Sequence, residues 1–210
     1  MSIDGEVVTT VADRFPWASW AIWDDVFPDG ECVEQRPERL VDFASEHVDH
    51  LTPDVVFLGL NRSDDLVEPF QNFHAPTRKH YDYRLKEFVQ DGDLDRLHGA
   101  YMTDLVDEVN PESTEVDVTD ADAAVLLEQL RLFGEREYHV ICFGNKAFDG
   151  LTDYFDAAGT TQPPEIKYAR TEVGELTLHL YRVWFYGLYG IYQDKVETLQ
   201  RQLQHIDERL

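Results

Sequence analysis

The chain has 210 residues, of which 43% are apolar, so it can bury a core; this excludes an intrinsically disordered protein and fits one domain. No apolar run approaches the roughly 20 residues of a membrane-spanning helix, and the acidic N-terminus lacks a secretory-signal pattern, so we expect a cytoplasmic protein. The two cysteines are too few for a disulfide scaffold, a cysteine-rich zinc site or a four-cysteine iron–sulfur cluster.

The charge of the chain is strongly negative, with 42 acidic residues against 18 Lys plus Arg and a net charge of −24. This composition is typical of halophilic proteins, because in molar salt the Debye length falls to about 3 Å and self-repulsion is screened. In such salt the net charge says little about nucleic-acid binding. The local distribution of charge is therefore more informative.

The predicted elements begin with an aromatic N-terminal extension, residues 1–35, that packs on the body of the domain. Within it, residues 13–28 carry aromatic side chains at spacings of three to four, which predicts a short amphipathic helix. Residues 54–60 then form a continuous apolar run bounded by Pro53 and Asn61. This run predicts a central parallel strand that is buried on both faces.

Helices and strands alternate along the rest of the chain. The remaining predicted helices span 37–50, about 80–90, 120–134, 145–159 and 191–208, and the remaining predicted strands span 99–105, 138–143, 166–173 and 176–184, with a loop at 160–165. This alternation predicts an α/β fold, a single three-layer α/β/α domain over residues 1–210 with a central, mostly parallel sheet. Ligands of such folds bind beyond the carboxyl ends of the parallel strands. The segments to inspect are 61–73, 103–104, 144–145 and 184–190.

The first of these segments follows Gly59 and contains Asn61. A glycine at a strand end permits a close approach of backbone or ligand, and an Asn there offers both a donor and an acceptor. The alternative is an ordinary turn after a strand. Phe70 and Phe73 lie in the same otherwise polar loop, where they either plug the core or form a stacking platform.

A basic segment follows directly. Residues 69–86 hold four bases against one acid, a local net charge of 4 − 1 = +3 in an acidic chain. The bases are Arg78, Lys79, Arg84 and Lys86. The segment is either a chance cluster that pairs with acids elsewhere or a site for a phosphate or another anion. In the second case we expect Arg78 and Lys79 to contact nucleic-acid phosphates.

The order of these motifs resembles the uracil-DNA glycosylase superfamily over about residues 50–205. The resemblance is carried by VVFLGLN at 55–61, the aromatic loop after it, GAYMTDLV at 99–106 and YHVICFGNKAF at 138–148. It implies a uracil-DNA glycosylase-like fold and a DNA-repair hydrolase that cleaves the N-glycosidic bond of a flipped, damaged or deaminated base.

The resemblance also implies roles for single residues. Asn61 would be catalytic and position the attacking water, Phe73, or less well Phe70, would stack on the base, and Asp104 would read the base edge. Further residues at the same strand ends would contact the substrate: Gly59, Leu60, Arg62, Asn145, Trp184 and Tyr186.

The chain departs from the family pattern in two places. Arg62-Ser63 stands where Pro-Gly usually follows the Asn, and the last motif, residues 182–190, has no His to stabilise the departing base. Tyr186 or Tyr189 would have to replace that His. An ionised Asp104 would repel a base anion, so the Asp indicates a base or ligand other than uracil. The aromatic run 184–186 is either a stacking surface or a cap on the sheet.

Three functions remain open at this stage. The first is a glycosylase, the second is a module that binds a nucleobase or nucleic acid without cleaving it, and the third is an unrelated small-molecule α/β enzyme. The sequence has no catalytic triad, P-loop, dinucleotide fingerprint or metal signature that would favour the third. Whether the chain is an enzyme therefore stays open. We expect DNA as the partner, no membrane, no cofactor and no metal ion, and we favour a monomer.

Overall fold

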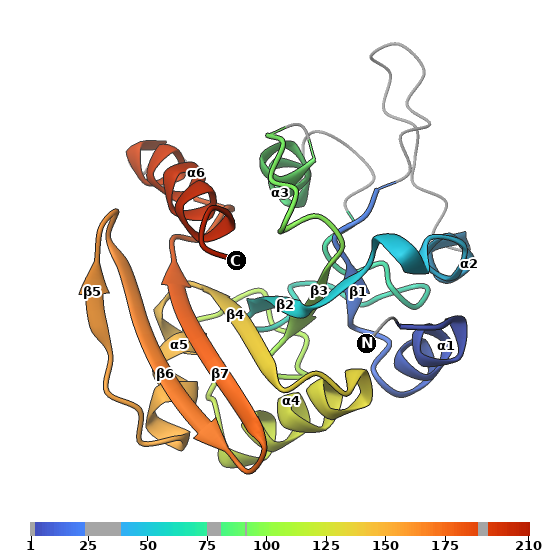
Figure 1. Cartoon of the computed structure of the whole chain (residues 1–210), viewed down its shortest axis with the longest axis horizontal. Coiled ribbons are helices and arrows are strands. Elements are labelled where there is room, and N and C mark those ends of the chain that lie inside the picture. The colour runs from blue at the N-terminus through green and yellow to red at the C-terminus, as the bar shows by residue number, and fades with distance from the viewer. Residues whose placement is uncertain (1–2, 24–38, 75–80, 91, 189–192) are drawn as a thin grey trace.

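A seven-stranded mixed sheet forms the centre of the protein (Figure 1). The computed structural model describes residues 3–23, 39–74, 81–90, 92–188 and 193–210. The strand order is β1-β3-β2-β4-β7-β6-β5. The strands are β1 Ser19–Trp20, β2 Thr52–Gly59, β3 Ala100–Asp104, β4 Glu137–Phe143, β5 Thr160–Gln162, β6 Ile166–Val173 and β7 Leu176–Val183.

The four central strands, β3, β2, β4 and β7, are parallel, whereas β1, β6 and β5 are antiparallel to their neighbours. The α/β fold is thus confirmed, but the sheet is mixed rather than mostly parallel. One reason is the two-residue connection Gly174-Glu175, which closes a hairpin between β6 and β7 with Gly174 at φ 64°. Another is β5, which lies where a loop was predicted at 160–165.

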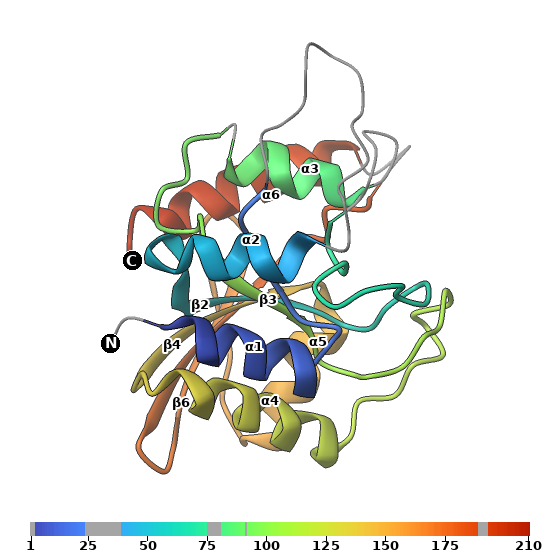
Figure 2. The ribbon, with the colours of Figure 1, turned by 90° about the vertical axis from the view of Figure 1, so that its right-hand side faces the viewer.

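Helices cover both faces of the sheet (Figures 1 and 2). They are α1 Gly5–Arg14, α2 Leu40–Glu46, α3 Asp82–Val89, α4 Asp120–Phe133, α5 Asn145–Tyr154 and α6 Gln193–Asp207, with a short 3-10 helix η2 at Val48–His50. One apolar core joins α1, α2, α4 and α5 to one face, and a second joins α3 and α6 to the other. No helix in the described part of the chain is long and apolar enough to cross a membrane.

The predicted strand at 54–60 is confirmed as β2, which is paired in parallel with β3 on one side and β4 on the other. Val56 and Leu58 enter the core under α1 and α4, while Val55 and Phe57 enter the core under α3 and α6. Both faces of the strand are therefore buried, which explains why its sequence is continuously apolar rather than alternating.

The N-terminal segment differs from the prediction of a helix over 13–28. The helix α1 begins earlier, after Asp4, whose Oδ1 accepts a hydrogen bond of 3.0 Å from the Val7 amide. Residues 15–23 are not helical, and β1 within them pairs with β3. The reason is that 17–23 are all buried, so the segment has no polar side for an amphipathic helix. Residues 24–38 lie outside the described part.

The parallel strands place a ligand-binding position at one edge of the sheet. In chain order they are β2, β3, β4 and β7, and in the sheet β2 lies between β3 and β4. The chain therefore runs outward from β2 to β3 and then crosses back to β4. In α/β proteins such a reversal, here between β2 and β4, marks the edge of the sheet where ligands commonly bind.

Candidate functional site

The carboxyl ends of β2 and β3 bring Gly59 and Asp104 side by side. The two residues are register partners in the parallel pair. Backbone hydrogen bonds continue the pairing beyond both strands, from Leu105 to the Gly59 carbonyl at 3.1 Å and from Val106 to the Leu60 carbonyl at 2.9 Å. This ladder fixes Asp104 at the end of the sheet, where the sequence predicted a base-reading position.

Gly59 is needed because other atoms fill the space of a side chain. A Cβ at this position would lie 2.0 Å from Asp104 Oδ1 and 3.3 Å from Phe73 Cζ. The close approach expected at this glycine is thus made by a carboxyl group of the neighbouring strand. Gly59, Phe73 and Asp104 form one contact cluster.

The Asp104 carboxyl group is buried, with 4% of the residue exposed. Its Oδ2 accepts a hydrogen bond of 2.8 Å from Asn72 Nδ2. Burial raises the pKa of Asp104 to about 7; the Asn72 hydrogen bond and Arg62 oppose this shift, and Asp82 and Asp107 add to it. The group is therefore poised between its neutral and its ionised form near neutral pH.

The loop that carries Phe73 is strained. Phe70 and Phe73 have φ angles of 66° and 64°, in the left-handed region that bulky side chains rarely adopt. Several contacts hold the loop to the N-terminal segment. Ser19 Oγ donates to the Asn72 carbonyl at 2.9 Å, Asn72 Nδ2 donates to the Trp17 carbonyl at 2.8 Å, and the Phe70 amide donates to the Pro16 carbonyl at 3.3 Å. Strain of this kind costs about 1–3 kcal/mol per residue and clusters at functional sites.

The two aromatic residues of the loop lie in different cores. Phe70 packs in the core under α1 and lines a small cavity of about 10 Å³ together with Trp20 and Leu40. Phe73 packs in the core under α3 and α6, and its Cζ lies 3.3 Å from the position that a Cβ on Gly59 would take. Only Phe73 is therefore beside Asp104.

His74 follows in the same loop and is buried. Its Nε2 lies 3.1 Å from the Trp20 carbonyl. Burial lowers its pKa to about 4, against the opposing effect of that hydrogen bond. The imidazole is neutral at neutral pH, so it adds no positive charge to the basic segment 69–86.

Tyr186 comes from the segment after β7 and is buried in the same core as Phe73. Its hydroxyl forms a hydrogen bond with the Asp82 carboxylate, and burial raises its pKa well above the usual range, with further contributions from the charges of Asp82 and Asp104. Arg84 on α3 donates from Nη1 to the carbonyls of Tyr186 at 2.7 Å and Leu188 at 2.8 Å. The α3 helix thus holds residues 186–188 in place.

The basic segment uses two of its four bases inside the protein. Arg84 binds carbonyls of the 186–188 segment, and Lys86 is buried with its Nζ 5.6 Å from the centre of the Tyr83 ring. Arg78 and Lys79 lie outside the described residues. The expected phosphate contacts of this segment therefore depend on Arg78 and Lys79 alone.

Asn61 lies two residues beyond Gly59, after β2 has ended and past a bend at Leu60. Its Nδ2 donates to the carbonyls of Asn110 at 2.7 Å and Arg62 at 2.8 Å, so the amide hydrogens fix the segment after β3. The amide oxygen is the atom that can accept a hydrogen bond from water. Arg62 forms an ion pair with Asp107 in the same segment.

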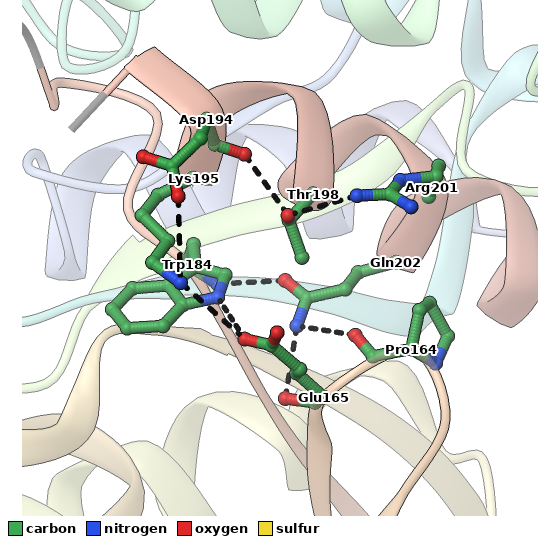
Figure 3. A network of polar contacts seen from close by, with 8 residues as sticks. All are labelled: Pro164, Glu165, Trp184, Asp194, Lys195, Thr198, Arg201 and Gln202. Atoms are coloured by element: carbon green, nitrogen blue, oxygen red, sulfur yellow. Dashed lines mark hydrogen bonds and ion pairs between the residues drawn. The ribbon is translucent and has the colours of Figure 1, made fainter.

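Figure 3 shows the residues that hold Trp184. They belong to other elements than the residues that hold Tyr186. Trp184 Nε1 donates to Glu165 Oε2 at 3.3 Å, and its backbone amide donates to Gln202 Oε1 at 2.9 Å. Lys195 Nζ lies 4.8 Å from its ring centre. These contacts tie Trp184 to α6 and to the segment before β6, whereas Tyr186 faces α3 and Asp104.

The remaining predicted site residues are peripheral to this cluster. Asn145 is exposed as the first residue of α5, and Leu60 packs partly on the core under α1. In the described residues, no group of three or more His, Cys, Asp or Glu side chains could hold a metal ion.

Two residues that bind side chains of the candidate site were not predicted from the sequence. Asn72 binds Asp104 directly, and Asp82 binds Tyr186. Asp82 is the one acid within the basic segment 69–86, which was a usable signal. Asn72 has no comparable signal, because only the folded loop brings it to Asp104.

No family model and no curated protein matches this sequence. The function has to be argued from the geometry of the chain itself, and the resemblance to uracil-DNA glycosylases stays a prediction.

Proposed function

We propose that the chain is a DNA base-excision glycosylase-like protein that hydrolyses the N-glycosidic bond of a flipped, damaged or deaminated base. The observation that carries this proposal is the contact cluster of Gly59, Phe73 and Asp104, with Tyr186 in the same core and Asn61 two residues further along the chain. The cluster lies at the carboxyl ends of the parallel strands β2 and β3, the edge of the sheet at which α/β proteins bind their ligands.

The chemistry needs three groups: a water beneath the sugar carbon, a surface for the flipped base and a donor that stabilises the departing base. The Asn61 amide oxygen suits the first role, because it can accept a hydrogen bond from the attacking water and so orient it. Phe73 is the aromatic ring beside Asp104 and is assigned the second role, since an aromatic ring stacks on any base. It is buried in the core under α3 and α6, so this role requires that packing to open. Asp104 and Tyr186 are the polar groups that can meet the base edge.

A second candidate is a module that binds a nucleobase or nucleic acid without cleaving it. The observation that favours it is the Tyr186 hydroxyl, which already forms a hydrogen bond with Asp82 and is therefore a poor donor to a leaving base. The last motif also lacks a His. Binding would then need the same cluster but no water held by Asn61.

The decisive experiment is a cleavage and binding assay in molar KCl with oligonucleotides that carry uracil, hypoxanthine or a mismatch. We expect cleavage of at least one substrate by the wild type, a large loss of the rate at saturating substrate in Asn61→Ala, and little change in its binding. Gln200→Ala, an exposed change on α6, is the matched control.

Because Asn61 also holds the segment after β3, unfolding of Asn61→Ala is measured in parallel. Binding without cleavage by the wild type would support the second candidate. Absence of both binding and cleavage by a folded wild type would refute both candidates.

A further inference from the structure

We propose that Tyr168 is a nucleophilic tyrosine that accepts an acyl group from a neutral activated ester, with His179 as the base that takes the proton of its hydroxyl. The site lies on the face of the sheet that α3 and α6 cover, near the amino-terminal end of β4. Asp104, in contrast, lies at the carboxyl end of β3. The inference therefore does not depend on the proposed function.

A row of three hydrogen-bonded side chains crosses neighbouring strands. The Tyr168 hydroxyl on β6 lies 2.8 Å from His179 Nδ1 on β7, and His179 Nε2 lies 2.7 Å from Glu137 Oε1 on β4. Because a carboxylate only accepts, Nε2 carries the hydrogen, and in the neutral imidazole Nδ1 then accepts from the tyrosine. A carboxylate, an imidazole and a hydroxyl in this order are the arrangement that activates a nucleophile.

The sheet leaves this row accessible to solvent. Along β7, Leu178 and Leu180 enter the core under α1 and α4, so His179 between them faces the other side. On that side α6 shares a core with Val183, near the carboxyl end of the strand. Figure 1 shows none of the described helices in front of the amino-terminal half of β7. The tyrosine and the imidazole of the row are accordingly half-buried and the carboxylate is exposed, so a small molecule can reach them.

A second imidazole beside the row is compatible with a positive charge on His179. The His139 ring stacks on His179, with ring centres 4.8 Å apart and planes at 11°, and its Nδ1 lies 3.1 Å from the Tyr181 hydroxyl. Burial lowers the pKa of His139, with a further contribution from His179, against the opposing charges of Glu137 and Asp54. His139 therefore stays neutral when His179 takes up a proton, and Glu137 stabilises the imidazolium.

The charges on this face favour a neutral substrate. Arg170, the register partner of His179 on β6, is paired with Glu172 at 2.8 Å, so these two charges cancel. Glu137 then leaves the row with a net negative charge. An anionic donor such as a phosphoric anhydride would be repelled, whereas a neutral ester would not.

The step is an acyl transfer. The Tyr168 oxygen forms a bond to the carbonyl carbon of the ester as its proton passes to His179 Nδ1. The bond between that carbon and the leaving oxygen breaks, and His179 returns the proton to the leaving group or to water. The products are an acylated tyrosine and the alcohol or phenol of the ester.

The test is acetylation of the full chain by p-nitrophenyl acetate in molar KCl, with the rate at each tyrosine followed by mass spectrometry of its peptide. Tyr154 is the internal reference, because it is 38% exposed and its ring contacts Phe155 on α5. General-base assistance is worth about 100- to 10,000-fold, so we expect Tyr168 to react at least about 100-fold faster than Tyr154.

Three variants assign the effect to the row. His179→Asn removes the base and should lower the rate at Tyr168 to that at Tyr154. Glu137→Gln should lower it in part, because an amide can donate to Nε2 and so favour the other tautomer of the imidazole. Glu175→Gln, the same charge change in the exposed turn between β6 and β7, should leave the rate unchanged. Near-ultraviolet circular dichroism checks that each variant is folded.

Equal rates at Tyr168 and Tyr154 in the wild type would overturn the inference, and so would an undiminished rate at Tyr168 in folded His179→Asn. Nitrogen-15 NMR of the imidazoles in the wild type is a second readout that needs no variant. A neutral His179 with its hydrogen on Nδ1 would also overturn the inference, because that nitrogen could not accept the tyrosine proton. None of these outcomes bears on the cleavage or binding of oligonucleotides, so the two proposals fail separately.

Discussion

Gly59→Ala is the sharpest perturbation of the cluster, because it adds one methyl group where the structure has no room. The new Cβ would lie 2.0 Å from Asp104 Oδ1, 3.2 Å from its Cγ and 3.3 Å from Phe73 Cζ. The central strand β2 is paired on both sides, so it cannot shift away. The Asp104 carboxyl group must therefore move and lose its hydrogen bond to Asn72.

The expected cost combines overpacking, about 1–3 kcal/mol, with the loss of one hydrogen bond, about 0.5–1.5 kcal/mol. We expect Gly59→Ala to lower the free energy of unfolding by about 1.5–4.5 kcal/mol. The assay is urea unfolding in molar KCl, followed by tryptophan fluorescence. Gly5→Ala is the matched control, because a Cβ on Gly5 meets nothing within 4 Å.

A double-mutant cycle isolates the contact itself. In an Asp104→Ala background the obstructing carboxyl group is gone, so Gly59→Ala should cost clearly less than in the wild type. The remaining cost comes from the Phe73 ring at 3.3 Å. Equal costs in both backgrounds would show that the carboxyl group does not fill the space above Gly59, and the geometry of the proposed site would be refuted.

Three further predictions concern stability. Gln202→Ala leaves the Trp184 amide and the carbonyls of Pro164 and Glu165 without their partner, so it should cost about 1–3 kcal/mol in urea unfolding, whereas the exposed Gln200→Ala should change little. The wild type should lose stability relative to Asp104→Asn as the pH rises from 3.8, the ordinary pKa of an Asp side chain, to about 7, the raised pKa of Asp104. In this range only the unfolded state releases the Asp104 proton, so the loss is at most about 1.4 kcal/mol per pH unit. A stability difference that stays constant with pH would contradict the raised pKa. The net charge of −24 predicts loss of near-ultraviolet circular dichroism as KCl is diluted, and an unchanged spectrum from molar to millimolar salt would refute halophilic behaviour.

Elements with complete local signals could be predicted from the sequence. The helix α4 begins after Thr119, which forms a capping box with Asp122, and ends at Gly134 with φ 70°. The strand β2 is recognisable because a fully buried strand needs no polar side. In both cases the pattern of neighbouring residues is enough to predict the element, without knowledge of its partners in the fold.

The N-terminal segment shows where such reasoning fails. Aromatic spacing predicted a helix over 13–28, but the tryptophans there are buried by the sheet edge and by the loop at 70–74. The partners come from far along the chain, and periodicity cannot detect them. The edge strand β5 was missed for a related reason, since it is only three residues long and depends on β6.

The candidate site could be predicted in part. The rule that ligands bind at the carboxyl ends of parallel strands selects Asp104 and the 184–190 segment without any structure. It cannot tell that Phe70 and Phe73, three residues apart, enter opposite cores, because their positive φ angles redirect the chain. The rule also does not predict that Trp184 contacts Glu165 whereas Tyr186 interacts with Asp82.

Two costs coincide at the end of β2, although the described residues carry strained backbone and buried unpaired polar atoms elsewhere as well. Along α4 the local signals and the fold agree, as expected where stability alone shapes the sequence. At the end of β2 the chain instead keeps a buried carboxyl group at Asp104 and a strained backbone at Phe73. An apolar residue at 104 would remove the first cost and a glycine at 73 the second. A site that holds a polar group away from water against its own stability is better explained by what that group binds than by folding.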